Sequence, residues 1–97
     1  MGKAKHTVCL VDDDAAVRNS FKLLMKSAAI NLITFGSAQE FLSGFDAKGV
    51  GCIILDVRMP GMNGLELQDV LRQRKVHIPI IIKLLRWLRE LLAKPRA

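Results

Sequence analysis

Short apolar runs alternate with amphipathic segments along the chain. The apolar runs contain many β-branched residues and read as strands buried on both faces, at residues 7–11, 31–35, 52–56 and 77–82. Helical patterns fill the intervals between them, at residues 15–28, at 37–45, and from residue 63 to the basic residues near 75. Strands that alternate with helices predict an α/β fold with a parallel sheet and right-handed crossover connections.

Polar residues at the expected helix starts support these boundaries. Asp14 stands directly before the first helical pattern, and Ser37 with Glu40, like Asn63 with Glu66, has the spacing of a capping box. In the first helix the apolar side chains share one face: Val17, Phe21, Leu24, Met25 and Ala28. We expect the side chains that follow the third strand to pack as ordinary apolar residues: Met59, Met62 and Leu65.

The last segment, residues 83–97, breaks the alternation. It holds five basic residues and one acidic residue, and its leucines recur at helical spacing on one face. No residue of the kind preferred at a helix N-cap precedes it. We therefore expect two parts, an α/β domain over residues 1–82 and a basic amphipathic helix and tail over residues 83–97.

Length and composition narrow the class of protein. The chain has 97 residues, enough for one hydrophobic core, and a net charge of +6. No apolar run approaches the roughly 18 residues of a membrane-spanning helix, and the N-terminus lacks the long apolar stretch of a secretory signal. We expect a cytoplasmic protein without a membrane span. Cys9 and Cys52 lie in apolar runs and are expected to be buried reduced thiols, with a disulfide between them as the alternative.

Acidic residues follow two of the predicted strands. Asp12 and Asp13 end the first strand and Asp56 ends the third. Taken singly, an Asp after a strand is often only a turn residue or, as we expect for Asp14, a helix cap. If the two strands are neighbours, however, three carboxylates converge at the carboxyl edge of the sheet, where α/β proteins bind ligands. A hard divalent cation such as Mg²⁺ would relieve their repulsion, and the same parts serve phosphoryl transfer.

The same residues carry a family resemblance. Residues 11–14 read V-D-D-D, and residues 55–67 read L-D-V-R-M-P-G-M-N-G-L-E-L, with the pattern D-x-x-M-P-x-M-x-G after a hydrophobic strand. This resembles the receiver domain of two-component response regulators over about residues 6–82. The resemblance implies a flavodoxin-like three-layer α/β sandwich with a parallel sheet.

The resemblance also implies a function. Asp56 would accept phosphate from a phosphohistidine of a sensor histidine kinase, with Mg²⁺ held by Asp12, Asp13, Asp56 and the backbone carbonyl of Arg58. Such a domain is a phosphoacceptor and not an enzyme, beyond self-phosphorylation from small donors and self-dephosphorylation. A Mg²⁺-dependent phosphatase with an Asp nucleophile is disfavoured, because a second Asp is expected two residues later, where Arg58 stands.

The C-terminal part departs from the family pattern. Receivers carry Ser or Thr after the fourth strand, where this chain has Lys83 or Leu84. Lys94 and Pro95 match the family dipeptide that ends a fifth strand, but the interval after Ile82 is too short for a helix and a strand. We therefore expect a truncated receiver with four strands, impaired in phosphoryl binding. Lys94 either reaches the acidic site or is a solvated tail lysine.

A missing fifth strand would leave an open sheet edge and an uncovered first helix. We expect the chain to form a homo-oligomer through that edge, the first helix and the C-terminal helix, without direct contact to nucleic acid. An alternative from another class is an α/β scaffold whose basic amphipathic tail mediates oligomerisation, DNA binding or membrane-surface binding.

Overall fold

The computed structural model describes residues 6–83. Its strands are β1 (Thr7–Val11), β2 (Asn31–Phe35), β3 (Val50–Asp56) and β4 (Ile80–Lys83). Its helices are α1 (Ala15–Ser27), α2 (Ala38–Gly44) and α3 (Gly64–Gln73). The amphipathic helix predicted after Lys83, including Lys94, lies outside the described residues.

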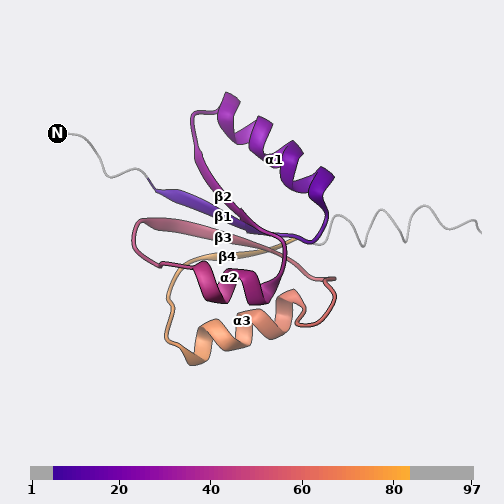
Figure 1. The fold of residues 1–97 in the computed structure, drawn as a ribbon. Coiled ribbons are helices and arrows are strands. Elements are labelled where there is room, and N and C mark those ends of the chain that lie inside the picture. Colours follow the sequence, from indigo (N-terminus) through magenta and orange to yellow (C-terminus); the bar gives the residue numbers. More distant parts are fainter. Residues whose placement is uncertain (1–5, 84–97) are drawn as a thin grey trace, which may run out of the picture.

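The described strands form one parallel sheet in the order β2-β1-β3-β4. Helix α1 lies against one face of the sheet, and α2 and α3 lie against the other (Figure 1). The strand order places β1 beside β3, and Val11 pairs with Leu55 at the carboxyl ends of these two strands. The predicted flavodoxin-like three-layer α/β fold is confirmed for this part of the chain.

The predicted caps begin all three helices. The Asp14 side chain accepts hydrogen bonds from the backbone N–H groups of Ala16 (2.9 Å) and Val17 (3.4 Å). Ser37 Oγ accepts one from Glu40 N–H at 3.0 Å. Asn63 and Glu66 form a complete capping box, with each side chain accepting from the backbone N–H of the other. These caps satisfy donors that the first turn of a helix leaves without partners.

Two strand starts differ from the sequence prediction. Strand β3 begins at Val50, two residues before the predicted start, and β4 begins at Ile80, after the predicted start at residue 77. Pro79 has no N–H to donate to the ladder, so only its carbonyl takes part, accepting from Ile53 N–H at 3.0 Å. The backbone therefore becomes regular only after the proline.

The hydrophobic core lies between the sheet and the helices α2 and α3. Phe41 is at its centre, fully buried, and contacts Phe35 edge-on and Phe45 by stacking, with ring centroids 5.2 Å and 4.5 Å away. Met59 is buried in this core and Met62 packs against it, as predicted. The prediction for Leu65 was wrong, because its side chain is 51% exposed on the outer face of α3.

Helix α1 is held more loosely than the other two helices. Val17, Phe21 and Met25 are half-buried and recur every four residues, so they form the stripe that faces the sheet. Leu24, which the sequence placed on the same apolar face, is 60% exposed.

Cys9 and Cys52 are free thiols, with Cys9 buried and Cys52 half-buried. Within residues 6–83 we find no helix with the length and apolar character needed to cross a membrane.

Candidate functional site

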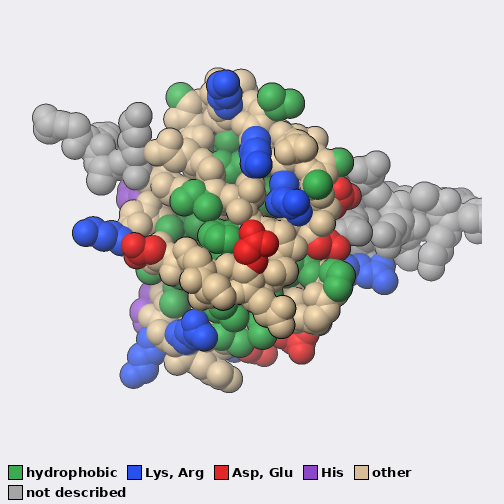
Figure 2. All heavy atoms as spheres, viewed as in Figure 1, with side chains coloured by type: hydrophobic (Ala, Val, Ile, Leu, Met, Phe, Trp, Pro, Cys, Tyr) green, Lys and Arg blue, Asp and Glu red, His purple; other side chains and the backbone are tan. Residues whose placement is uncertain are grey.

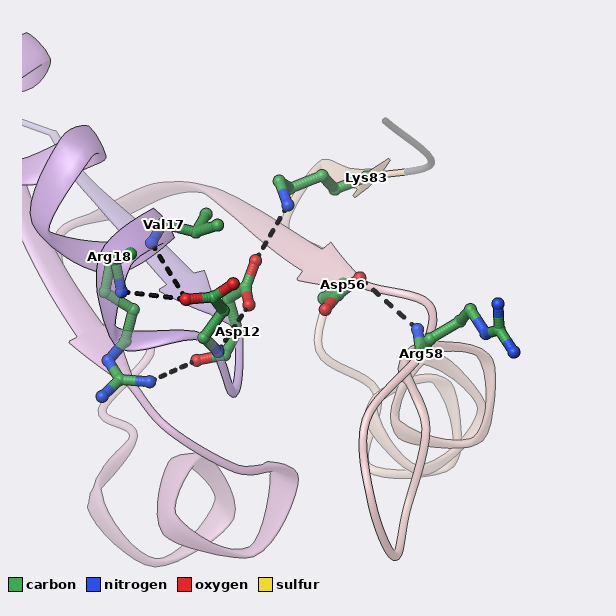
Figure 3. Close-up of polar contacts among 8 residues, drawn as sticks. Asp12, Val17, Arg18, Asp56, Arg58 and Lys83 are labelled. Carbon is green, nitrogen blue, oxygen red and sulfur yellow. Dashed lines mark hydrogen bonds and ion pairs between the residues drawn. The ribbon is translucent and has the colours of Figure 1, made fainter. Parts of the chain in front are cut away.

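Three carboxylates meet at the carboxyl edge of the sheet. Asp12 follows β1 and Asp56 is the last residue of β3, and both are almost completely buried, at 0% and 1% exposure. Asp13 is half-buried beside them. One oxygen of each carboxylate lies within 4.8 Å of the others. Figure 3 shows two of the three, Asp12 and Asp56. The convergence predicted from the sequence is therefore present, because β1 and β3 are neighbours that end at the same level.

The backbone and side chain of Asp12 are fixed by several hydrogen bonds. Its N–H donates to the Phe35 carbonyl at 3.0 Å, which extends the β1–β2 ladder by one residue. Its Oδ1 accepts from Asp14 N–H at 2.9 Å, and its carbonyl accepts from the Arg18 guanidinium at 2.8 Å. Arg18 thus ties the first turns of α1 to the site (Figure 3).

Asp56 is positioned by the loop and helix that follow it. Its Oδ1 accepts a long hydrogen bond from Arg58 N–H, at 3.4 Å. The first residue of α3, Gly64, is buried against the Asp56 backbone, and a Cβ at Gly64 would lie 2.3 Å from the Asp56 carbonyl oxygen. Glycine is therefore the residue that allows α3 to begin so close to the end of β3.

The structure adds Lys83 to the site. From the sequence, Lys83 was expected only to stand at or next to the position of the family hydroxyl, unable to replace it, and no role of its own was predicted for it. Its Nζ lies 2.9 Å from Asp12 Oδ2, and its side chain is only 10% exposed (Figure 3). The pairing of Asp56 with Lys83 in the β3–β4 register brings it there. The sequence does contain a signal for this contact. Lys83 follows the apolar run of the fourth strand, as Asp12 and Asp56 follow the first and third.

The donor set suits Mg²⁺. This cation takes oxygen ligands, commonly one or two carboxylates with retained waters. The site offers three carboxylates, two of them buried, at a spacing that one ion can bridge. Buried like charges repel, so a divalent cation would stabilise the arrangement electrostatically. That the Arg58 carbonyl is a further ligand stays a prediction, and Lys94 lies outside the described residues.

The comparisons with known proteins agree with the fold. The family model of the response regulator receiver domain matches residues 8–83. The transcriptional regulatory protein TdiR of Thauera aromatica is 44% identical over 75 residues, which are 77% of this chain and 33% of TdiR. The chain spans about a third of the length of the curated relatives it matches.

Solved structures give the same result. The structure of the response regulator StyR has a TM-score of 0.77 at 44% identity, covering 81% of this chain and 40% of that chain. The response regulator TrrA of Thermotoga maritima, solved in complex with Mg²⁺ and BeF, has a TM-score of 0.72 at 28% identity, covering 79% and 67%. The chain belongs to the response regulator receiver domain family of two-component signalling.

Proposed function

We propose that this chain is a Mg²⁺-dependent phosphoacceptor that takes a phosphoryl group onto Asp56 from a sensor histidine kinase. The observation that carries the proposal is the meeting of Asp12, Asp13 and Asp56 within 4.8 Å at the carboxyl edge of the sheet. Receiver domains are in general phosphoacceptors rather than enzymes, and the chain has the fold and the acidic residues of one.

In the proposed phosphoryl transfer, the nucleophile and the metal ligands have separate roles. An oxygen of the Asp56 carboxylate attacks the phosphorus of the donor phosphohistidine, the P–N bond breaks with its electrons returning to the imidazole, and an acyl phosphate forms. Asp12, Asp13 and the Arg58 carbonyl would hold Mg²⁺ together with Asp56. The bound ion supplies positive charge that offsets the charge on the phosphoryl oxygens.

Two further observations support Asp56 as the acceptor. It ends β3 at the exit of the sheet, and its backbone is held between the strand and Gly64 of α3, so its position is defined on both sides. The related regulator TrrA was solved with Mg²⁺ and BeF. Beryllofluoride resembles a phosphoryl group in shape and charge, so that complex supports a corresponding use of the acidic site here.

Phosphorylation of the chain by acetyl phosphate with Mg²⁺, followed by intact-mass spectrometry, tests the assignment. We expect the mass of one phosphoryl group, removed by hydroxylamine as acyl phosphates are, and absent in Asp56→Asn. Asp46→Asn changes an exposed carboxylate in the loop before β3 and is the matched control. Undiminished modification of Asp56→Asn would remove Asp56 as the acceptor, and metal-independent modification would remove the role of Mg²⁺.

We also propose that a second copy of this chain covers apolar side chains that are exposed on α1 and β4: Leu23, Leu24 and Ile81. These side chains are 72%, 60% and 54% exposed. Ile81 is on β4, which is an edge strand among the described residues. Figure 2 shows hydrophobic side chains at the surface between basic ones in the upper half of the molecule, where α1 lies. Apolar patches of this kind often mark interfaces.

Light scattering after size exclusion tests the association. We expect a mass above the 10.8 kDa of the single chain, lowered towards it in Leu23→Lys/Leu24→Lys. The matched control is Leu65→Lys, which changes an exposed leucine on α3. A wild-type chain that elutes at 10.8 kDa at all concentrations would contradict the proposal.

A further inference from the structure

Lys83 reaches the acidic site from a distant strand. It ends β4 and pairs with Asp56, whereas its Nζ contacts Asp12, which follows β1. In the sheet, β3 separates β4 from β1, so the two backbones are about 10 Å apart at a strand spacing of about 4.8 Å. The extended lysine side chain and the Asp12 side chain, with the 2.9 Å contact between them, together cover that distance. Figure 3 shows the Lys83 ammonium pointing from the end of β4 towards the Asp12 carboxylate.

The contact has the features of a buried ion pair. The Nζ–Oδ2 distance is 2.9 Å, and the two side chains are 10% and 0% exposed. A charge-assisted hydrogen bond in such a poorly solvated place is stronger than an ion pair on the surface. For comparison, the ion pair of Arg72 with Asp69 on α3 measures 3.4 Å, with side chains 72% and 65% exposed. Lys83 is therefore part of the buried acidic site.

Both oxygens of Asp12 are engaged in this arrangement. Oδ1 accepts from Asp14 N–H and Oδ2 accepts from Lys83 Nζ. A divalent cation bound to Oδ2 would stand next to the ammonium, and two cations that close together repel strongly in a poorly solvated site. Metal binding through this oxygen therefore requires that Lys83 leave it.

We propose that Lys83 is the resident cation of the acidic site, which holds Asp12 in the metal-free protein and competes with a divalent cation for Asp12 Oδ2. It is a positioning residue, acting on the site through Asp12. The proposal rests on the proposed function in one respect, that the three carboxylates bind Mg²⁺. Its consequence is that the chain binds Mg²⁺ more weakly than the same carboxylates would without the lysine.

The test uses the full chain and Lys83→Met, which keeps the apolar stem and removes the charge. Isothermal titration calorimetry with MgCl₂ measures the metal affinity, and thermal unfolding in EDTA measures the metal-free stability. We expect Lys83→Met to bind Mg²⁺ about tenfold more tightly, because the charge-assisted hydrogen bond no longer has to be broken. In EDTA its midpoint falls below that of wild type, because the buried Asp12 carboxylate loses its cation.

Two matched variants complete the design. Lys83→Arg retains the charge and is expected to keep the wild-type Mg²⁺ affinity within about threefold. Lys48→Met removes an exposed lysine from the loop before β3 and should change neither readout. Should Lys83→Met not fold in EDTA, Lys83→Gln provides a neutral polar side chain, one bond shorter than lysine, and the same affinity gain is expected.

The outcomes separate this inference from the proposed function. Equal or weaker Mg²⁺ binding by Lys83→Met than by wild type overturns the competition, while the metal site itself stands. An unchanged midpoint in EDTA overturns the role of Lys83 in the metal-free protein. If neither wild type nor Lys83→Met binds Mg²⁺, the metal part of the proposed function fails and the competition fails with it.

Discussion

The two faces of the sheet are covered to different depths. The face that carries α2 and α3 has a continuous core. Its buried side chains come from the sheet, from both helices and from the loop after β3: Cys9, Val11, Ala38, Phe41, Ile53, Leu55, Met59, Leu67 and Leu71. On the other face Leu10 is fully buried, but α1 itself contributes no buried residue. Leu23 and Leu24 of α1 are mostly exposed instead.

This difference indicates how stability and function are divided in the described part of the chain. Packing against α2 and α3 supplies most of the buried apolar surface and fixes the ends of β1 and β3, where the carboxylates lie. Helix α1 contacts the sheet through half-buried side chains, and Arg18 near its N-terminal end donates a hydrogen bond to the Asp12 carbonyl. Elements with few buried contacts open more easily, so α1 is expected to be the less stable layer.

The largest test of this comparison removes one side chain from each face. Phe41→Ala is expected to lower the free energy of unfolding by about 3–5 kcal/mol, because a fully buried ring leaves a cavity between two other rings. Leu24→Ala on α1 should cost less than about 1 kcal/mol, since the side chain is 60% exposed. Urea unfolding measures both. Equal losses in the two variants would show that α1 is packed as firmly as α2.

A second test concerns the start of α3. Gly64→Ala places a methyl group where no space exists, 2.3 Å from the Asp56 carbonyl oxygen, so the helix or the end of β3 must shift. We expect a loss of about 1–3 kcal/mol, together with slower phosphorylation of Asp56 by acetyl phosphate. Leu65→Ala, one residue further on and exposed, is the control. Gly64→Ala with wild-type stability and phosphorylation would contradict this account of the site.

The sequence predicted those parts of the molecule that depend on local patterns. The bounds of β1 and β2, the three caps and the convergence of Asp12 with Asp56 follow from periodicity, capping chemistry and the geometry of parallel strands. The contact of Lys83 with Asp12 could not be predicted in this way, because it depends on the β3–β4 register and on a side chain that reaches past the neighbouring strand. The exposure of Leu24 likewise depends on how little of α1 the sheet covers.

The two cysteines report on the two faces separately. Cys9 lies in the core under α2 and α3, whereas Cys52 pairs with Val8 in the sheet register and faces α1. Burial, with a smaller contribution from Cys52, raises the pKa of the Cys9 thiol above 9.0. The unfolded chain therefore loses its Cys9 proton first, so this residue makes stability fall as pH rises above 9.0.

The reactivity of the two thiols tests this difference between the two faces of the sheet. We expect a thiol reagent in excess to modify Cys52 at least about tenfold faster than Cys9, because reaction at Cys9 requires a larger opening of the core. In addition, Cys9→Ala should lose part of the decline in stability at high pH, and Cys52→Ala should keep most of it. Modification of both thiols at one rate would indicate that the two faces open together.

The smallest expected effects come from the C-terminal ends of α1 and α3. Ala29 and Lys75 adopt left-handed conformations, with φ of 56° and 59°, in matching Schellman turns in which Ile30 N–H donates to Met25 and Val76 N–H to Leu71. Glycine avoids the steric cost of this conformation but has more freedom in the unfolded chain, so each substitution should stabilise by about 0.5–1 kcal/mol.

The kind of measurement that detects each gain in stability shows how far the α1 layer differs from the layer of α2 and α3. Lys75→Gly ends a helix that packs on the main core, so its gain should be visible in urea unfolding of the whole domain. Ala29→Gly ends the looser helix, and its gain should be visible chiefly as slower hydrogen exchange of the α1 amides. If Ala29→Gly raises the global free energy of unfolding as much as Lys75→Gly does, α1 unfolds with the core and the sheet has one cooperative unit on both faces.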